Sequence, residues 1–178
     1  MEPLKYENRH GKTYVLHARQ RSDGRVAYVL SPTIGAGALA QLPAGYEISE
    51  NVHGHVGVRK TKPSVIRADE VAAVRHVLDE DSYTRVACEV HVRGKVLEVY
   101  ERDRPYEVMG KTFERTTFQI AMRFTLVDPD SRTFDAERAC WRSWANGWLQ
   151  IGTTDRLEAL AASFLPHIGK ESFYDLAF

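Results

Sequence analysis

The sequence of 178 residues predicts an α+β protein in which an antiparallel β meander, at about residues 84–151, packs against two main helices. The clearest sign is segment 118–126, where apolar residues alternate with polar or small ones. A strand with one buried face repeats with this period of two. The second sign is the helical spacing of apolar residues in 69–78 and 155–168. Predicted strands also follow one another in runs, which favours an antiparallel sheet over strict strand–helix alternation.

The meander is predicted to begin with a hairpin of residues 84–92 and 95–101, which turns at Arg93-Gly94. This register places Val90 opposite Leu97 on the core side.

The later part of the meander contains two turn signals. A five-residue loop at 128–132 places Arg123 opposite Glu137 and Phe124 opposite Ala136. Asn146-Gly147 is a strong type I′ turn signal. The corresponding strands are predicted at 118–126, 133–143 and 148–151.

Two helices are predicted to cover this sheet. In 69–78 an apolar stripe faces the core and Glu70 faces outward. In 155–168, Asp155 and Glu158 form a capping pair at the start of the helix.

The N-terminal third predicts two β-hairpins, which turn at residues 22–24 and 51–54 because Gly, Asp and Asn favour tight turns. A short helical turn is expected at 38–42. The sequence therefore predicts a β-hairpin module at 1–62 and an α+β domain at 63–178.

The composition is that of a globular protein, with 43% hydrophobic and 27% charged residues. The net charge is zero, but residues 1–63 contain nine Lys and Arg against five Asp and Glu. No signal peptide and no membrane-spanning segment is predicted. Cys88 and Cys140 fall in apolar strand patterns, as expected of reduced, buried thiols. We therefore expect a cytoplasmic protein that does not contact a membrane.

Three short segments carry a resemblance to a known group of proteins. They are Gly11-Lys12-Thr13-Tyr14-Val15-Leu16-His17, Pro43-Ala44-Gly45-Tyr46-Glu47-Ile48 and Leu165-Pro166-His167-Ile168-Gly169-Lys170-Glu171-Ser172-Phe173-Tyr174. Together they resemble an uncharacterised family of bacterial hypothetical proteins with no assigned activity. The resemblance implies a shared fold and no functional residue.

Gly35-Ala36-Gly37-Ala38-Leu39-Ala40 matches the G-x-G-x-x-A spacing of dinucleotide-binding loops. Such a loop needs a helix that returns the chain to a parallel strand, whereas Pro43 follows within a few residues. We interpret the segment as a Gly-rich connection and expect no cofactor.

His53 and His55 stand two residues apart, a spacing that suits chelation of a metal from one strand edge. Zinc sites need three or four ligands, and the two cysteines are predicted in the core. The alternative interpretation is a pair of solvent-exposed turn histidines.

A candidate acid–base site lies on the outer face of the hairpin at 84–101. The predicted register places Glu89 opposite Glu98, with His91 two residues along. Paired carboxylates raise each other's pKa, and a nearby imidazole can share the proton. The alternative is a solvated sheet face, and a one-residue change of register would separate the three side chains.

Segment 141–148 gathers all three tryptophans around Arg142, and Arg138 is nearby. Trp and Arg are enriched at interface hot spots, and Trp is also a common core residue. The candidate binding residues are Arg138, Trp141, Arg142, Trp144 and Trp148.

The basic N-terminal hairpins predict a second candidate surface, for the phosphates of a nucleic acid. Its residues are Lys12, Arg19, Arg21, Arg25, Arg59, Lys60 and Lys62.

The sequence thus favours a non-catalytic binding protein that uses a sheet face and the Trp/Arg-rich hairpin. Its expected partner is another protein or a second copy of the chain. Nucleic-acid binding and an enzyme with a Glu/Glu/His site are the alternatives, and the pattern leaves enzymatic activity open.

Overall fold

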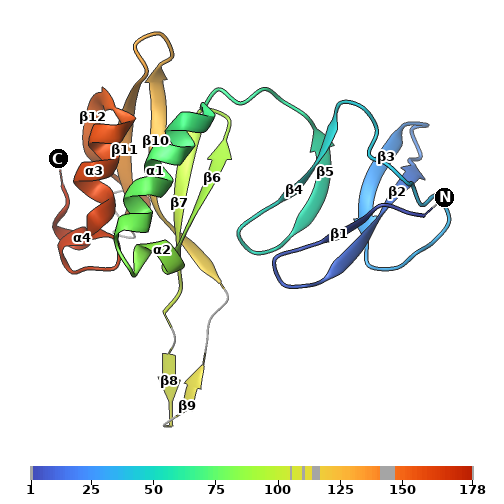
Figure 1. The fold of residues 1–178 in the computed structure, drawn as a ribbon, viewed down its shortest axis with the longest axis horizontal. Helices are drawn as coiled ribbons and strands as arrows, with labels where there is room; N and C mark the ends of the chain where they lie inside the picture. Colours follow the sequence, from blue (N-terminus) through green and yellow to red (C-terminus); the bar gives the residue numbers. More distant parts are fainter. Residues whose placement is uncertain (1, 105, 110, 114–116, 141–146, 178) are drawn as a thin grey trace. The chain divides into compact units, whose positions relative to one another are not determined.

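The computed structural model describes residues 2–104, 106–109, 111–113, 117–140 and 147–177. The chain has the predicted α+β fold with antiparallel sheets (Figure 1). It divides into two compact units, Met1–Pro63 and Ser64–Phe178.

The N-terminal unit combines a three-stranded sheet with a two-stranded hairpin. The sheet has the order β1 (Lys5–Glu7), β2 (Thr13–Gln20) and β3 (Val26–Ser31), and the hairpin consists of β4 (Tyr46–Glu50) and β5 (Val56–Lys60). Both predicted hairpins are present, whereas β1 was not predicted. The rings of Tyr28 and Tyr46 meet edge to face, with their centroids 4.7 Å apart.

The prediction of a helical turn at 38–42 is wrong. Ala38 instead forms an isolated antiparallel bridge with His17 of β2, which gives this backbone an extended course. Gly35 and Gly37 therefore lie in a connecting loop, and the described segment 38–45 that follows them contains no helix.

The first and third turns of this unit are built from the same short sequence. Glu-Asn-x-His-Gly occurs at residues 7–11 and again at residues 50–54. In each copy the Asn side chain accepts two backbone N–H groups of its own turn, at 2.9–3.1 Å in the first and 3.0 Å in the second. The Gly has a positive φ in both, +72° and +73°. Each Asn therefore stabilises the turn of its own hairpin, Asn8 between β1 and β2 and Asn51 between β4 and β5.

The two turns also pack directly against each other. Asn8 Nδ2 donates to the carbonyl of Gly54 at 2.7 Å, and Arg9 Nη1 donates to the carbonyl of Val52 at 3.0 Å. His10 Nε2 lies 3.2 Å from the carbonyl of His53, to which it donates. A Cβ at Gly54 would collide with the His10 ring, so this close contact requires glycine.

Asn8 and Asn51 provide a matched pair of substitutions. We expect Asn8→Ala to lower the free energy of unfolding by about 2–3 kcal/mol, because it removes both turn bonds and leaves a buried carbonyl unpaired. Asn51 forms the turn bonds but is exposed, so Asn51→Ala should cost about 1 kcal/mol. Urea denaturation of the full chain measures both values. Equal losses would contradict a specific role for the bond between the turns.

The C-terminal unit contains a five-stranded antiparallel sheet with the order β12-β11-β10-β7-β6. Its strands are β6 (Cys88–Arg93), β7 (Val96–Arg102), β10 (Phe118–Asp128), β11 (Thr133–Cys140) and β12 (Gly147–Arg156). A separate hairpin of β8 (Tyr106–Val108) and β9 (Lys111–Phe113) lies between β7 and β10 in the chain. The helical segments are α1 (Ala68–Glu80), α2 (Thr84–Ala87), α3 (Leu157–Phe164), a 3₁₀ turn (Leu165–His167) and α4 (Ser172–Asp175).

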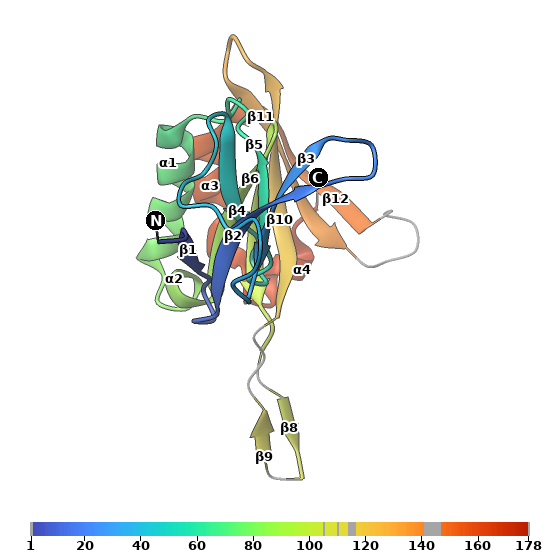
Figure 2. The same ribbon diagram turned by 90° about the vertical axis from the view of Figure 1, so that its right-hand side faces the viewer.

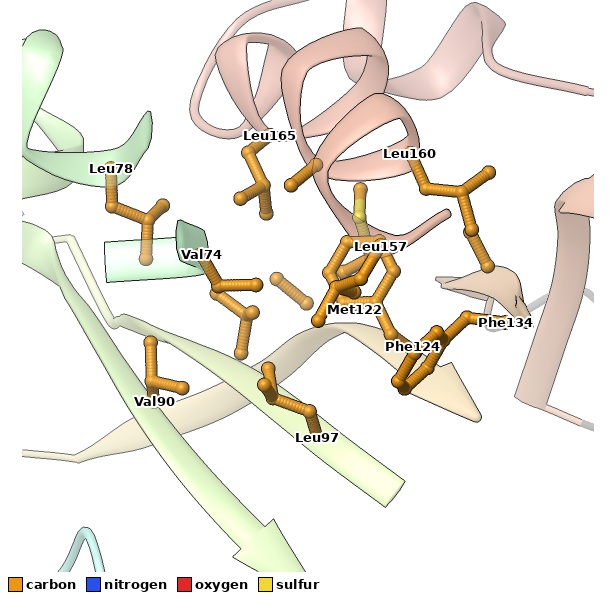
Figure 3. Packing of buried hydrophobic residues seen from close by; sticks show 14 of the residues in the cluster. Val74, Leu78, Val90, Leu97, Met122, Phe124, Phe134, Leu157, Leu160 and Leu165 are labelled. Atoms are coloured by element: carbon orange, nitrogen blue, oxygen red, sulfur yellow. The ribbon is translucent and has the colours of Figure 1, made fainter. Parts of the chain in front are cut away.

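Helices α1 and α3 lie on one face of this sheet (Figures 1 and 2). Figure 3 shows Val74 and Leu78 of α1 pointing toward Leu97 and Met122 of the sheet. Phe124 and Phe134 lie next to the residues of α3, and both are fully buried. Burial of a large apolar side chain contributes about 1.5–3 kcal/mol, so this cluster is the main stabilising feature of the unit.

The alternation predicted for β10 holds for Met122, Phe124 and Leu126, which are all buried in the core. It fails at Ile120, which is only half-buried, because a β-bulge lies between Ile120 and Met122 in the pairing with β7, whereas Phe118 is buried as predicted. The extra residue shifts the alternation by one position. Ile120 therefore pairs with Tyr100, and its side chain belongs to the face opposite the helices.

The register predicted for the first hairpin of the meander is also wrong. Residues Thr84–Ala87 form α2 instead of a strand, and the hairpin turns at Gly94 and Lys95. Val90 consequently pairs with Val99, while Val92 pairs with Leu97. The change moves each partner by two positions, so every side chain keeps its predicted face.

Glu70 is buried and does not face outward as predicted. One carboxylate oxygen accepts the backbone N–H of Arg67 at 2.7 Å, and the carboxylate also forms an ion pair with Arg132. The predicted Asp155/Glu158 cap is absent as well, because β12 continues to Arg156 and α3 begins at Leu157 without a side-chain cap.

Candidate binding face

The side chains that point away from α1 and α3 form what we call the outer face of the five-stranded sheet. Arg123 of β10 stands at its centre, opposite Glu98 of β7 on one side and Glu137 of β11 on the other. The Arg123–Glu137 pairing is the one predicted from the loop length. Neighbouring strands contribute His91, which pairs with Glu98, and Trp148, which pairs with Ala139 two residues after Glu137.

Arg123 is held rigidly by two different contacts. Its Nε and Nη2 atoms donate to the two carboxylate oxygens of Glu137 at 2.6 and 2.9 Å. Its guanidinium carbon lies 3.9 Å from the centre of the Trp148 ring, a cation–π contact. The Arg123 and Glu137 side chains keep 31% and 23% of their surface exposed. The Arg123 and Glu137 side chains are therefore held in a fixed geometry and are still accessible to a partner.

A second group lies on the other side of Arg123. The Tyr100 hydroxyl donates to Glu98 Oε2 at 3.0 Å, and the His91 ring stands edge-on to the Tyr100 ring at 5.9 Å. Burial and the bond to Glu98 raise the pKa of Tyr100 to about 12. Tyr100 therefore remains a neutral hydrogen-bond donor at physiological pH. We call Arg123, Glu137, Trp148, Glu98, Tyr100 and His91 the outer-face cluster.

The acid–base site proposed from the sequence is only partly assembled. His91 does lie directly opposite Glu98, but Glu89 pairs with Tyr100 and not with Glu98. The pair of facing carboxylates on which the hypothesis depended is therefore absent. His91 and Glu98 also line neither of the two cavities described below.

The Trp/Arg-rich hairpin is described only at its two ends, because Trp141, Arg142 and Trp144 lie outside the described residues. Arg138 is 7% exposed and donates to the carbonyls of Tyr174 and Leu176 at 2.9 and 2.7 Å. It thus anchors the C-terminal segment to the sheet, on the helix side. Trp148 is the described member that lies on the outer face.

The seven basic residues predicted to contact nucleic acid are all exposed. Lys12 belongs to the turn at one end of β2, whereas Arg21 and Arg25 belong to the turn at its other end. The eight residues of β2 span roughly 25 Å, so these side chains do not form one compact patch. Arg25 and Arg59 also pair with carboxylates, those of Asp23 and Glu47. The remaining three residues of the set are Arg19, Lys60 and Lys62.

His53 and His55 lie close together, with ring centroids 6.3 Å apart. His55 Nδ1 contacts the Asn51 side chain at 3.3 Å. Within the described residues, no group of three or more His, Cys, Asp or Glu side chains is arranged to hold a metal ion.

The larger cavity, of about 410 Å³, lies beside the ends of β7 and β10. Three of its charged lining residues, Glu101, Arg104 and Lys170, already bond to other groups of the chain. Tyr83 donates to Glu101 at 2.5 Å, Arg104 donates to the carbonyl of Gly169 at 2.5 Å, and Lys170 pairs with Asp81 at 3.2 Å.

A smaller cavity of about 170 Å³ reaches Cys88. Burial, followed by the negative charge of Glu101, raises the pKa of this thiol to about 12. Cys88 is thus a protonated, unreactive thiol at neutral pH.

No family model, curated protein or solved structure matches the chain. In the described part of the chain, no helix is long and apolar enough to cross a membrane. The fold and the site thus define an α+β protein with an ordered charged and aromatic sheet face.

Sequence reasoning missed Tyr100 as a member of the site. The sequence could have predicted it, because Tyr100 lies two residues after Glu98 in the same strand and therefore points to the same face. The bulge that brings Ile120 next to Tyr100 had no sequence signal.

Proposed function

We propose that this protein is a non-catalytic binding protein whose outer-face cluster contacts another protein. The observation that carries the proposal is the fixed position of Arg123 between the Trp148 ring and the Glu137 carboxylate. Rigid Trp and Arg side chains lose little conformational entropy on binding, which makes such pairs effective anchors at interfaces.

The charges of the face support a protein partner over a nucleic acid. Glu98 and Glu137 flank Arg123 on both sides, and Asp135 follows on β11. These carboxylates would repel a phosphate backbone, whereas they suit a partner that presents Lys or Arg near apolar groups. The rings of Tyr100 and Trp148 supply the apolar contact area.

Affinity capture with the full chain, followed by titration with the purified captured protein, tests the proposal. We expect Trp148→Ala to raise the Kd about 30-fold, as for an interface hot spot. Tyr100→Ala should weaken binding in the same way.

Tyr174→Ala is a matched control, because Tyr174 is a tyrosine of α4 that is 73% exposed. It should leave the Kd unchanged. Equal affinities for all three variants would refute the proposal. Capture that disappears after nuclease treatment would do so too, and would point to the basic residues of the N-terminal unit.

A further inference from the structure

His17 lies on β2 and is 7% exposed, and both of its ring nitrogens contact the backbone. Nδ1 lies 2.9 Å from the carbonyl oxygen of Val15. Nε2 accepts the backbone N–H of Gly35 at 3.2 Å. A carbonyl oxygen can only accept and an N–H can only donate, so the ring must carry its proton on Nδ1 and a lone pair on Nε2. This pattern identifies one neutral tautomer.

The bond to Gly35 holds the loop between β3 and the His17–Ala38 bridge. Every residue of this loop, Pro32–Gly37, is exposed. Its far end is fixed by Gly37, whose carbonyl accepts the N–H of Ala18 at 2.8 Å. Gly37 approaches so closely that an added Cβ would lie 2.5 Å from the Ala18 oxygen. In this fully described segment, the Nε2 contact is the hydrogen bond recorded between the middle of the loop and the sheet.

A second proton on His17 would reverse the role of Nε2. The ring would then present N–H toward the N–H of Gly35, which replaces a hydrogen bond with a repulsive contact between two donors. The bond to Val15 would survive, because Nδ1 donates in both forms. Protonation therefore breaks the bond to the loop at Gly35 and leaves the bond within strand β2 intact.

The ionisable groups around His17 do not compensate for an added positive charge. On its face of the sheet, β1 contributes Lys5 and Glu7, and β2 contributes Arg19. Glu7 pairs with Thr13, four residues from His17, or roughly 13 Å along the strand. The described residues of β3 and of 32–42 add no ionisable side chain on this face.

We propose that His17 is a pH-dependent latch that holds loop 32–37 on the β2 strand while its ring is neutral and releases the loop when the ring is protonated. The bond exists while the ring carries one proton and is lost when the ring takes up a second. The predicted result is a local change of loop order and not unfolding of the N-terminal unit.

Nuclear magnetic resonance of the full chain tests this proposal in two measurements. Long-range proton–nitrogen correlation should show Nδ1 protonated and Nε2 unprotonated at about pH 7.5. Amide exchange of Gly35, corrected for the intrinsic effect of pH, should become about tenfold faster once the ring is protonated. Exchange of the Leu16 amide, which donates to Leu4 within the unit, should change little.

Two variants separate the latch from general destabilisation. The amide oxygen of His17→Gln can accept from Gly35 at every pH, so the Gly35 amide should stay protected throughout. His17→Phe keeps a ring without an acceptor and should leave this amide unprotected at both pH values. Two results in the unmodified chain would overturn the proposal: a neutral ring that carries its proton on Nε2, or a Gly35 amide that stays protected after the ring is protonated. Both measurements remain possible even if a variant fails to fold.

Discussion

Replacing Glu70 by Ala should lower the free energy of unfolding of the C-terminal unit by about 3–5 kcal/mol, because the change leaves a charge unpaired in a buried site. Glu70 and Arg132 have side chains only 7% and 17% exposed. Arg132 Nε donates to Glu70 Oε1 at 2.8 Å, and the same carboxylate caps the first turn of α1. The substitution therefore removes the cap and the ion pair together.

Asp69→Ala is the matched control for this prediction. Asp69 is the neighbouring acidic residue in the first turn of α1, and it is exposed. Its interaction with the helix dipole is expected to contribute only about 0.5 kcal/mol. Chemical denaturation followed by circular dichroism compares the variants, and a double-mutant cycle with Arg132→Ala should give a coupling energy of about 2–3 kcal/mol. Similar losses for Glu70→Ala and Asp69→Ala would contradict this account.

Gly169→Ala should cost about 3–5 kcal/mol, because two unfavourable effects act at one position. Gly169 has φ of +80°, which a residue with a Cβ adopts only with strain. An added Cβ would also enter the ring of Tyr83, at 2.7 Å from Cδ1 and closer still to Cε1. The Tyr83 ring cannot easily move away, since its hydroxyl is bonded to Glu101.

Gly94→Ala isolates the first of these effects. Gly94 has a similar φ of +62°, but no atom lies within 4 Å of the place its Cβ would take. This control should cost about 1–2 kcal/mol. In a Tyr83→Ala background, Gly169→Ala should cost no more than the control. If the full penalty of Gly169→Ala persisted without the Tyr83 ring, the steric explanation would be wrong.

The sequence predicted the elements of the fold better than their alignment. The strands β4 and β5 and the pairing of Arg123 with Glu137 follow from turn residues and from the alternation of apolar and polar residues in the sequence, which are local signals. The register of β6 on β7 depended on which residues occupy the turn, and Arg93-Gly94 and Gly94-Lys95 are both plausible turn pairs by composition.

The departures inside the C-terminal unit come from contacts distant in the chain. Glu70 was expected in solvent because helical spacing placed it away from the apolar stripe. Its partner Arg132 lies 62 residues further along the chain, and no local sequence pattern predicts this pairing. The candidate site is affected in the same way, since the bulge near Ala121 determines which residues of β10 reach the outer face.

Because the two Glu-Asn-x-His-Gly turns pack against each other, the hairpin of β4 and β5 depends on residues at the beginning of the chain. Arg9 reaches Val52 across 43 residues, and Tyr6 reaches Glu50 across 44. A fragment that started at β2 would keep the sequence of β4 and β5 but would lack the surface on which their turn rests. Truncation from the amino end should accordingly damage the whole N-terminal unit, so fusion tags are best joined upstream of an intact first turn.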